Sequence, residues 1–397
     1  MKIDDKTSHN SPSLRFPEFT GEWERCVLGD VLEFSNTRIN SSELNSGNYV
    51  STENILQNFQ GIVKARSIPE DTNVMAFSCG NILLSNIRPY LKKVWKATFN
   101  GGCSSDVFVL QANSNIDADY LHYVVANDKF IGFVMNGAKG VKMPRGDKNQ
   151  MKTYSLSLPS IKEQRKISRF LSFLDERIAV QNRLIDRLQS LMIGLNNSLY
   201  EQYGNDITTS FMELGYSYSG LSGKSAKDFG SGKPFITYLN VYSNIIVDET
   251  DYQYVRINDG EKQNIVRTGD VLFTLSSETP EEVGIGSVYL GEKEVYLNSF
   301  CFGIHIERNQ LAYSPYLSYY VTSTAFRKFI YPFAQGSTRF NLCKADFEKA
   351  SIKLPSLDNQ KRISAMLDCI AEKIQAEKAI LEYYNIQRQY LLRQMFI

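Results

Sequence analysis

The feature that most constrains this sequence is an internal repeat. The segment Leu156–Ser168 (LSLPSIKEQRKIS) reappears as Ile352–Ser364 (IKLPSLDNQKRIS), 196 residues further along the 397-residue chain. A long internal repeat decides the architecture before any local motif does, because equivalent segments fold into equivalent structures. We therefore expect the chain to consist of two structurally equivalent halves.

The correspondence extends upstream of this segment. Asp119–Tyr123 matches Pro315–Tyr319 at the same offset, and Gly80–Leu84 matches Gly269–Phe273 at an offset of 189. Each half is therefore predicted to contain one globular domain followed by one long helix. The predicted boundaries are 1–155 and 204–350 for the two globular domains, and 156–203 and 351–397 for the two helices.

The globular parts are predicted to be α/β (α+β) domains. Short runs rich in β-branched and aromatic residues, bounded by Gly, Asn and Asp, indicate strands at Val107–Leu110, Ile236–Leu239 and Phe302–Ile306. Apolar residues at helical spacing indicate helix in Asp119–Phe133 and Pro315–Phe329. The strand order stays open, because a single sequence does not specify it.

The two long helices carry a heptad pattern. After Pro159, and again in the second half, apolar residues recur at alternating steps of four and three, with Gln181 and Glu377 as equivalent polar members. Each seam runs for about 40 residues, or ~60 Å, which is longer than a small domain is wide. A helix packed on its own domain is the alternative, but we expect an antiparallel coiled coil that separates the two domains. The predicted seam residues are Ile167, Leu171, Leu174, Ile178, Ile185, Leu188, Ile363, Leu367, Ile370, Ile374 and Leu381.

Motifs for catalysis are missing from the sequence. No two prolines are adjacent, as an adenine methyltransferase motif needs, and no Glu-x-Lys of the common Mg²⁺-dependent nucleases occurs. Gly284-Ile-Gly286 lacks the third glycine of a dinucleotide fingerprint, and Tyr218 stands where a phosphate-binding loop ending at Gly223-Lys224-Ser225 needs glycine. Three histidines and six scattered cysteines show no metal-ligand or catalytic spacing. We therefore expect no catalytic residue, no metal site and no cofactor in this chain.

Localisation is predicted from what the sequence does not contain. No apolar run approaches the ~18 residues of a membrane span. The N-terminus lacks the basic and then apolar order of a signal peptide. A cytoplasmic protein without a membrane partner is the expectation.

Charge is nearly balanced, with 44 basic and 43 acidic residues. A self-sufficient DNA-binding domain is usually basic, but the distribution of charge matters more than its sum. Basic residues cluster within Arg88–Lys96, Lys139–Lys152 and Arg308–Ala345. An ordinary solvated surface would explain any one of these clusters, whereas their matching places in the two halves favour a shared role.

Several segments together resemble one family. Leu14–Phe19 (LRFPEF), Trp23, Leu28-Gly29-Asp30, the two Leu-Pro-x-x-x-x-Gln elements and the heptad helices resemble a type I restriction–modification specificity subunit. The resemblance covers essentially the whole chain, and the repeat of domain plus helix is its most specific feature. It implies two target recognition domains, each of which reads one part of a split site in double-stranded DNA.

The resemblance also implies the partners. The antiparallel helices would set the spacing between the domains and dock two modification subunits. S-adenosylmethionine would be used by those subunits, and ATP and Mg²⁺ by restriction (motor-nuclease) subunits, rather than by this chain. Partner subunits could carry much of the phosphate contact, which would account for the near-neutral charge.

DNA contacts are expected on loops rich in basic, amide and aromatic residues. Arginine can pair with guanine, asparagine with adenine, and lysine neutralises phosphate. The two halves differ after Ser276, where Glu278, Glu281 and Glu282 replace basic residues. The predicted DNA-binding residues are Asn86, Arg88, Tyr90, Lys92, Lys93, Lys96, Lys139, Lys142, Arg145, Lys224, Lys233, Ser276, Thr338, Arg339 and Asn341.

Two other classes of function stay open. A structural coiled-coil adaptor would have no DNA role, and a gel shift of the purified complex at low and moderate salt would identify it. A self-contained DNA-modifying enzyme is disfavoured by the missing motifs, and methyl transfer by the chain alone would reveal it.

Overall fold

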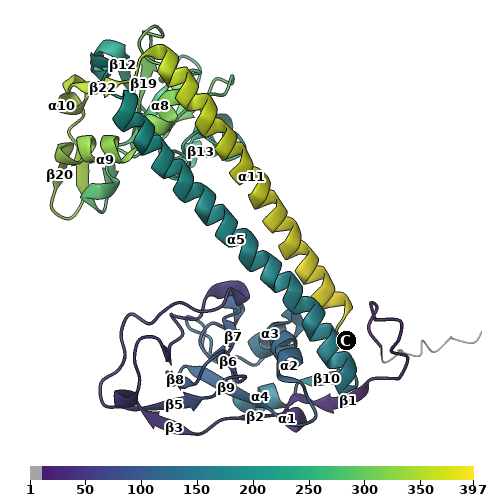
Figure 1. Cartoon of the computed structure of the whole chain (residues 1–397). Coiled ribbons are helices and arrows are strands. Elements are labelled where there is room, and N and C mark those ends of the chain that lie inside the picture. The colour runs from purple at the N-terminus through teal and green to yellow at the C-terminus, as the bar shows by residue number, and fades with distance from the viewer. Residues whose placement is uncertain (1–10) are drawn as a thin grey trace, which may run out of the picture. The chain divides into compact units, whose positions relative to one another are not determined.

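The computed structural model describes residues 11–397, which form two compact units (Figure 1). Unit 1 runs to Asn182 and also includes Ile380–Ile397, whereas unit 2 comprises Arg183–Ala379. Two long helices, α5 (Ile161–Tyr203) and α11 (Leu357–Gln394), each contribute residues to both units. Each unit therefore combines one globular domain with a part of each long helix.

The centre of unit 1 is a four-stranded antiparallel sheet in the order β2-β9-β6-β7. Strand β9 (Val107–Ala112) is buried on both faces along its first four residues, so its side chains serve two cores. Phe108 and Leu110 pack in the core that contains the helices, and Val107 and Val109 pack in a second core with Trp95. A strand that is buried on both faces has a continuous run of apolar residues in its sequence, as this segment has.

The remaining elements of unit 1 surround this sheet. A second sheet has the order β3-β5-β8-β4, and β1 pairs with β10. The bounds are β1 Glu24–Val27, α1 Leu28–Val31, β2 Leu32–Phe34, β3 Arg38–Asn40, η1 Ser41–Glu43, β4 Tyr49–Val50, η2 Gln57–Phe59, β5 Asn73–Phe77, β6 Ile82–Ser85, η3 Pro89–Leu91, β7 Val94–Lys96, β8 Gly101–Cys103, α2 Ala118–Val125, α3 Asp128–Asn136, α4 Lys148–Lys152 and β10 Ser155–Leu158.

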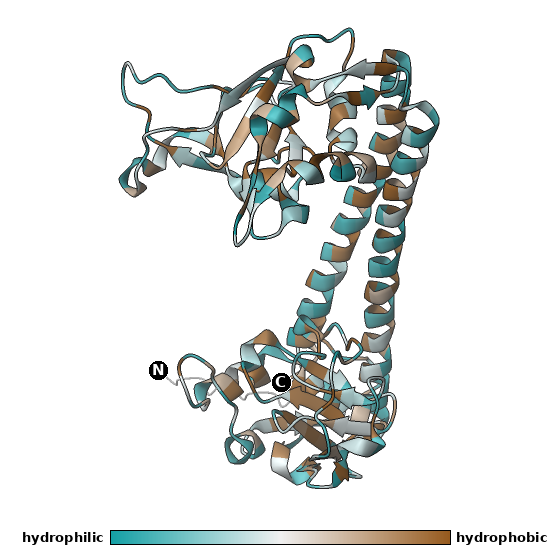
Figure 2. Cartoon of the chain, turned by 90° about the vertical axis from the view of Figure 1, so that its left-hand side faces the viewer, coloured by the Kyte–Doolittle hydropathy of each residue, from teal (hydrophilic) through white to brown (hydrophobic). Residues whose placement is uncertain are grey.

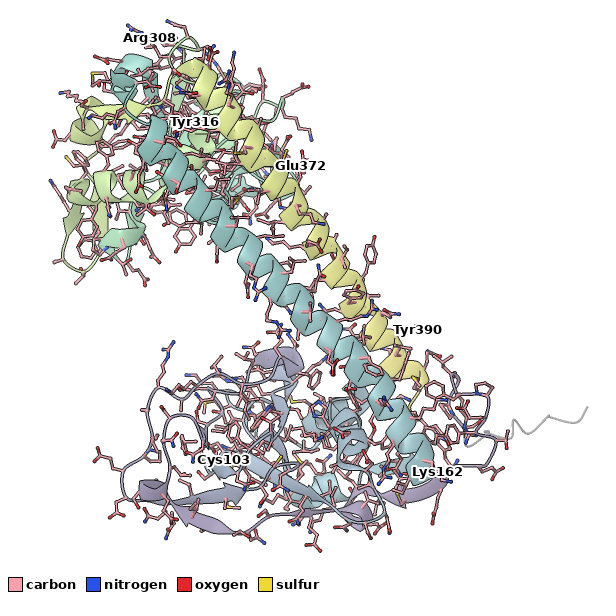
Figure 3. All side chains as sticks on the ribbon, in the orientation of Figure 1. Cys103, Lys162, Arg308, Tyr316, Glu372 and Tyr390 are labelled. Carbon is pink, nitrogen blue, oxygen red and sulfur yellow. The ribbon has the colours of Figure 1, made fainter. Side chains whose placement is uncertain are left out.

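Unit 2 repeats the plan. Its central antiparallel sheet has the order β12-β19-β15-β17, and the register Leu272↔Gly303 corresponds to Leu83↔Val109 of unit 1. The smaller sheets are β14-β13-β18, β16-β21-β20 and β11-β22. Figure 3 shows Cys103 and Tyr316, which are both fully buried, within the side chains of their respective units.

The elements of unit 2 have the following bounds: β11 Ile207–Thr209, α6 Phe211–Leu214, β12 Gly215–Ser219, η4 Ala226–Asp228, β13 Phe229–Ile236, α7 Tyr238–Ser243, β14 Tyr252–Val255, β15 Val271–Thr274, β16 Ser276–Ser277, η5 Pro280–Glu282, β17 Gly286–Val288, β18 Tyr296–Leu297, β19 Cys301–Ile306, α8 Ser314–Tyr320, α9 Thr324–Ile330, η6 Tyr331–Phe333, β20 Ala334–Gly336, β21 Phe340–Leu342, α10 Lys344–Lys349 and β22 Ile352–Leu354.

The repeated Leu-Pro-x-x-x-x-Gln element ties each long helix to the domain before it. Gln164 Nε2 donates to Pro159 O at 2.9 Å, and Gln164 Oε1 accepts from Asp117 N at 2.8 Å. Gln360 makes the same two bonds, to Pro355 O at 2.9 Å and from Tyr313 N at 2.8 Å. Both glutamines are buried, so these bonds satisfy their amides and fix the start of each helix.

The long helices lie side by side and antiparallel within each unit (Figure 1). In unit 1, Arg388 Nε of α11 lies 2.5 Å from Asp175 Oδ1 of α5, and Leu171 shares a core with Leu391. In unit 2, Leu195 packs against the core that contains Leu367. Hydrophobic residues recur along both helices in Figure 2, and every predicted seam residue is buried or half-buried. The predicted fold class, repeated α+β domains with a pair of long antiparallel helices, is confirmed.

Some local predictions were wrong. Ile236–Leu239 is not a strand, because β13 ends at Ile236 and Thr237 caps helix α7, its Oγ1 accepting from Asn240 N. Each predicted helical stretch is two helices: Asn127 caps α3 and Ser323 caps α9. A side-chain cap satisfies the free N–H groups that start a new helix.

His122 on α2 provides a prediction for the pH dependence of stability. The histidine is half-buried, its Nδ1 atom is enclosed without a hydrogen-bond partner, and burial lowers its pKa to about 4. The unfolded state therefore binds a proton between pH 6.5 and 4 that the folded state does not, so stability falls as the pH falls through this window. From the lowering of this pKa, we expect unit 1 to lose about 1–2 kcal/mol between pH 7 and pH 5.

Urea unfolding at both pH values would measure this loss. The chain has two tryptophans, Trp23 and Trp95, and both lie in unit 1, so their fluorescence reports that unit. The variant His122→Leu should show a smaller pH dependence than the wild type. An identical dependence in both proteins would show that His122 does not titrate as proposed.

Candidate DNA interface

Unit 1 brings together the two loops in which DNA contacts were predicted for the first half. Asn86–Tyr90 follows β6 and Lys139–Arg145 follows α3, yet Ile87 and Arg145 pair through their backbones as an antiparallel bridge. Arg88 N also donates to Pro144 O at 2.8 Å, and Gly146 N donates to Asn86 O at 3.1 Å. The exposed side chains of Arg88, Tyr90, Lys139, Lys142 and Arg145 therefore belong to a single surface, here called the unit 1 loop surface.

The backbone of this surface has an unusual conformation. Arg88 and Lys92 both have φ of +52°, and they flank the short helix η3. A left-handed conformation is uncommon for a residue other than glycine and persists where neighbouring structure imposes it. The bond from Arg88 N to Pro144 O is part of that structure, so the fold fixes the direction of the Arg88 backbone.

Asn86 differs from its neighbours on this loop. Its Oδ1 atom is enclosed in the protein and has no hydrogen-bond partner. The Asn86 side chain therefore points into the protein, whereas Arg88 and Tyr90 are exposed.

The three predicted lysines that follow are engaged within unit 1. Lys92 Nζ lies 2.5 Å from Asp128 Oδ1 of α3, and Lys96 forms an ion pair with Asp119 of α2. Lys93 Nζ donates to Thr52 O at 2.6 Å, and burial lowers the pKa of this lysine. The acidic partners lie on helices distant in sequence, so the sequence did not reveal these contacts. A phosphate contact by any of them would compete with an existing bond.

Unit 2 presents the equivalent surface on a hairpin. Strands β20 and β21 form this hairpin, and Ser276 of β16 pairs with Asn341 of β21. Thr338 and Arg339 lie at its tip and are exposed, as is Asn341, whereas Ser276 is buried. The guanidinium of Arg339 lies over the ring of Phe300, with 5.8 Å between Cζ and the ring centroid.

The two surfaces are built in the same register. The Ile87↔Arg145 bridge of unit 1 corresponds to Ser276↔Asn341 of unit 2 at the offsets of 189 and 196 residues seen in the sequence. The Lys139↔Arg145 bridge corresponds likewise to Gln335↔Asn341. The two units therefore present different side chains on one backbone frame.

The remaining predicted lysines of unit 2 differ in accessibility. Lys224 Nζ lies 2.5 Å from Glu261 Oε1 and donates to Arg256 O at 2.6 Å, and its side chain is nearly buried. Its hydrogen bond is the main reason that the pKa of Glu261 is lowered to about 2. Lys233, on β13, is exposed. Of the two, Lys233 is the one whose ammonium is free to meet a ligand.

Two residues of these surfaces were missed by sequence reasoning. Asp106 Oδ1 lies 3.2 Å from Arg145 Nη1, and Phe300 lies under Arg339. Aligning the strands that follow them, β9 and β19, would have placed both at equivalent positions. Aspartate and phenylalanine differ in chemistry, so a comparison of residue identities between the two halves does not reveal that Asp106 and Phe300 are equivalent.

The described residues offer little for other kinds of site. Across residues 11–397, no group of three or more His, Cys, Asp and Glu side chains is placed to hold a metal ion. In the same part of the chain, no helix has the length and apolar character to cross a membrane. The geometry defines a duplicated module, in which two loop surfaces are built on one backbone frame and each globular domain is followed by a long helix.

Comparison with known proteins gives the family. The model of the type I restriction modification DNA specificity domain matches residues 20–190 and again residues 221–383. The two matches together cover most of the chain, and they fall on its two repeated halves. This chain belongs to the type I restriction–modification DNA specificity family.

Individual relatives agree with this assignment. The chain is 29% identical over 119 residues to the type I restriction enzyme EcoDI specificity subunit of Escherichia coli, a match of 29% of this chain and 26% of that protein. It is 22% identical to the MjaVIII specificity subunit of Methanocaldococcus jannaschii, over 94% of this chain and 93% of that one. The segments matched in EcoDI and in the EcoKI subunit span 26% and 32% of those proteins.

A solved structure shows a similar fold over nearly all of the chain. The S subunit of a type I restriction–modification system from M. genitalium superposes with a TM-score of 0.56 at 15% identity, over 98% of this chain and 99% of that one. At this identity the likeness concerns the fold.

Proposed function

We propose that this chain is the DNA-sequence-reading subunit of a type I restriction–modification enzyme, in which each unit reads one half of a split target. The observation that carries the proposal is the pair of loop surfaces built in equal register with different exposed side chains. An equal frame places each surface on DNA in the same way, and different side chains allow each to select a different sequence.

Within these surfaces, direct reading falls to the exposed polar residues. Arg88, Arg145 and Arg339 can each pair with guanine, and Asn341 can pair with adenine. Lys142 and Thr338 suit backbone phosphates, and Tyr90 offers an exposed aromatic face. Lys139 Nζ lies 3.0 Å from Asp147 Oδ2, but its side chain is 82% exposed, so it also suits a phosphate.

The chain's own role in this proposal is recognition, not catalysis. S-adenosylmethionine would be bound by two modification subunits, and ATP and Mg²⁺ would be used by restriction subunits that join the same assembly. The described residues supply the contacts to DNA bases and the surfaces for assembly.

The long helices carry a second apolar stripe that suits the modification subunits. On α5, Phe170, Phe173, Val180, Leu184 and Leu191 are exposed at spacings of three, four and seven residues. The stripe begins at an apolar groove of about 420 Å³ that is also lined by Phe16, Arg165, Lys166 and Arg169.

The α11 helix carries an exposed apolar stripe that matches the α5 stripe at two positions. Met366 and Ile380 are exposed at the positions equivalent to Phe170 and Leu184, and Tyr383 and Tyr390 extend the stripe. Exposed apolar stripes of this extent mark interaction surfaces. An exposed apolar stripe on each helix suits one copy of a partner on each, which supports the expected pair of modification subunits.

We expect Phe173→Asp to weaken binding of the modification subunit about tenfold, because a carboxylate would be buried against apolar surface. Pull-down titration or calorimetry of the purified subunits would measure the affinity. Val63→Asp is the matched control, since Val63 is similarly exposed but lies outside the helices. Equal affinities for both variants would contradict the docking role of the stripe.

Methylome sequencing of the host with and without this gene would test the proposed function. A split motif that is methylated only when the gene is present is the expected result. Methylation by the purified chain alone would show instead that it is a self-contained enzyme. Unchanged methylation and no binding of DNA by the assembled complex would favour a structural adaptor.

A further inference from the structure

Asp106 and Phe300 occupy the same place in the two units. Asn86 N donates to Asp106 O at 2.8 Å, and Leu275 N donates to Phe300 O at 2.8 Å. Each acceptor comes directly before an equivalent strand, β9 or β19, and each donor directly after β6 or β15. The equivalence therefore rests on backbone geometry and not on the identity of the side chains.

Each of these residues contacts an arginine of its own loop surface. Asp106 Oδ1 lies 3.2 Å from Arg145 Nη1, and the Arg339 guanidinium lies 5.8 Å from the Phe300 ring centroid. The two arginines come from the equivalent loops after α3 and in the β20–β21 hairpin. One position of the fold thus contacts an exposed arginine in both units, through a charge in one and a ring face in the other.

The exposure of Phe300 argues against an ordinary packing role. The side chain is 56% exposed, although its backbone is hydrogen-bonded at the ends of β15 and β19, the two inner strands of the central sheet. A phenylalanine stabilises a fold by burying its apolar surface, and a ring that is mostly exposed gains little of this stabilisation. An exposed ring with a guanidinium above it is arranged to orient that guanidinium.

We propose that Asp106 and Phe300 are positioning residues that orient Arg145 and Arg339 for pairing with guanine, one in each half-site. This inference rests on the proposed function and adds the base that each arginine reads. A guanidinium held over a ring face by cation–π attraction spends no hydrogen bond on that contact, so its N–H groups stay available for guanine O6 and N7. An arginine already oriented loses less conformational freedom when it binds.

The two positioning residues should differ in their effect on binding to non-specific DNA. Asp106 brings a negative charge to a surface that faces phosphates, so it weakens sequence-independent attraction to DNA while it orients Arg145. Phe300 carries no charge and should affect sequence discrimination alone. This difference separates a positioning role from a general effect on folding.

The assembled complex, with its modification subunits, provides the test of Phe300. Binding is measured at fixed salt to the native target and to duplexes in which each G·C pair of either half-site is replaced singly. Phe300→Ala should lower discrimination at one G·C pair of one half-site about two- to fivefold, the range for an exposed cation–π contact. Phe300→Trp should retain the discrimination of the wild type, because tryptophan also offers a ring face to the guanidinium. Tyr331 is a similarly exposed aromatic residue of unit 2, so Tyr331→Ala is the control and should discriminate as the wild type does.

Asp106 is tested on the same panel. Asp106→Ala should lower discrimination at one G·C pair of the other half-site and also raise affinity for non-specific DNA, whereas Asp106→Glu should resemble the wild type. Glu70→Ala removes an exposed negative charge elsewhere in unit 1 and controls for net charge.

The outcomes distinguish this inference from the proposed function. If the wild-type complex shows a split preference but Phe300→Ala and Asp106→Ala discriminate as it does, or lose discrimination equally at every pair, the positioning role is wrong. If the wild-type complex shows no split preference, the proposed function itself fails.

Discussion

Leu171→Ala and Leu367→Ala should each lower the free energy of unfolding of the affected unit by about 2–5 kcal/mol. The two leucines are 196 residues apart at equivalent positions of α5 and α11, and they are 1% and 0% exposed. Each belongs to the main core of its unit, where the helix meets the globular domain. Truncation removes buried apolar contacts and leaves a cavity that the surrounding side chains fill only in part.

Urea unfolding would measure both losses. Tryptophan fluorescence follows unit 1, which contains both tryptophans, and far-UV circular dichroism follows both units. Leu191→Ala is the matched control, because this leucine lies on α5 but is 56% exposed. Leu188 is half-buried and should give an intermediate loss. If Leu191→Ala were as damaging as Leu171→Ala, the division of α5 into a buried and an exposed stripe would be wrong.

Arg88→Ala should weaken or relax reading of one half-site by about 1–3 kcal/mol if Arg88 contacts a base, and Arg339→Ala should do the same at the other half-site alone. The physical reason is that the two loop surfaces belong to separate units with separate cores. Methylome sequencing of hosts carrying each variant would measure the change at every position of the motif. Arg66→Ala, at an exposed arginine of unit 1 outside the loop surface, is a control that should leave the motif unaltered.

The same experiment tests the role of the helices. Lengthening both helices by one turn, ~5.4 Å, should widen the gap in the target by one or two base pairs, since DNA rises 3.4 Å per pair. Both half-sites should keep their sequences. An Arg88→Ala variant that altered both halves equally, or an insertion that changed the half-site sequences, would contradict independent reading.

The sequence predicted the large features because their physical causes are local or repeated. The heptad spacing after Pro159 predicted α5, and the structure starts that helix at Ile161. The offset of 189 residues places Ser276 opposite Ile87 in the repeat, and both residues pair with the equivalent loop of their unit. Local errors arose at caps such as Thr237, where a side-chain bond ended an apolar run that otherwise resembled a strand.

What the sequence by itself determined is therefore the duplication, the two seams and the loops that carry basic residues, because each is written in residue spacing. The tertiary structure decided which of those residues are free. Lys92, Lys96 and Lys224 meet carboxylates brought from distant segments, whereas Arg88 and Arg339 stay exposed. The tertiary structure also placed Asp106 and Phe300 beside their arginines. Such contacts depend on the packing of segments far apart in the chain, and spacing along one sequence does not contain that information.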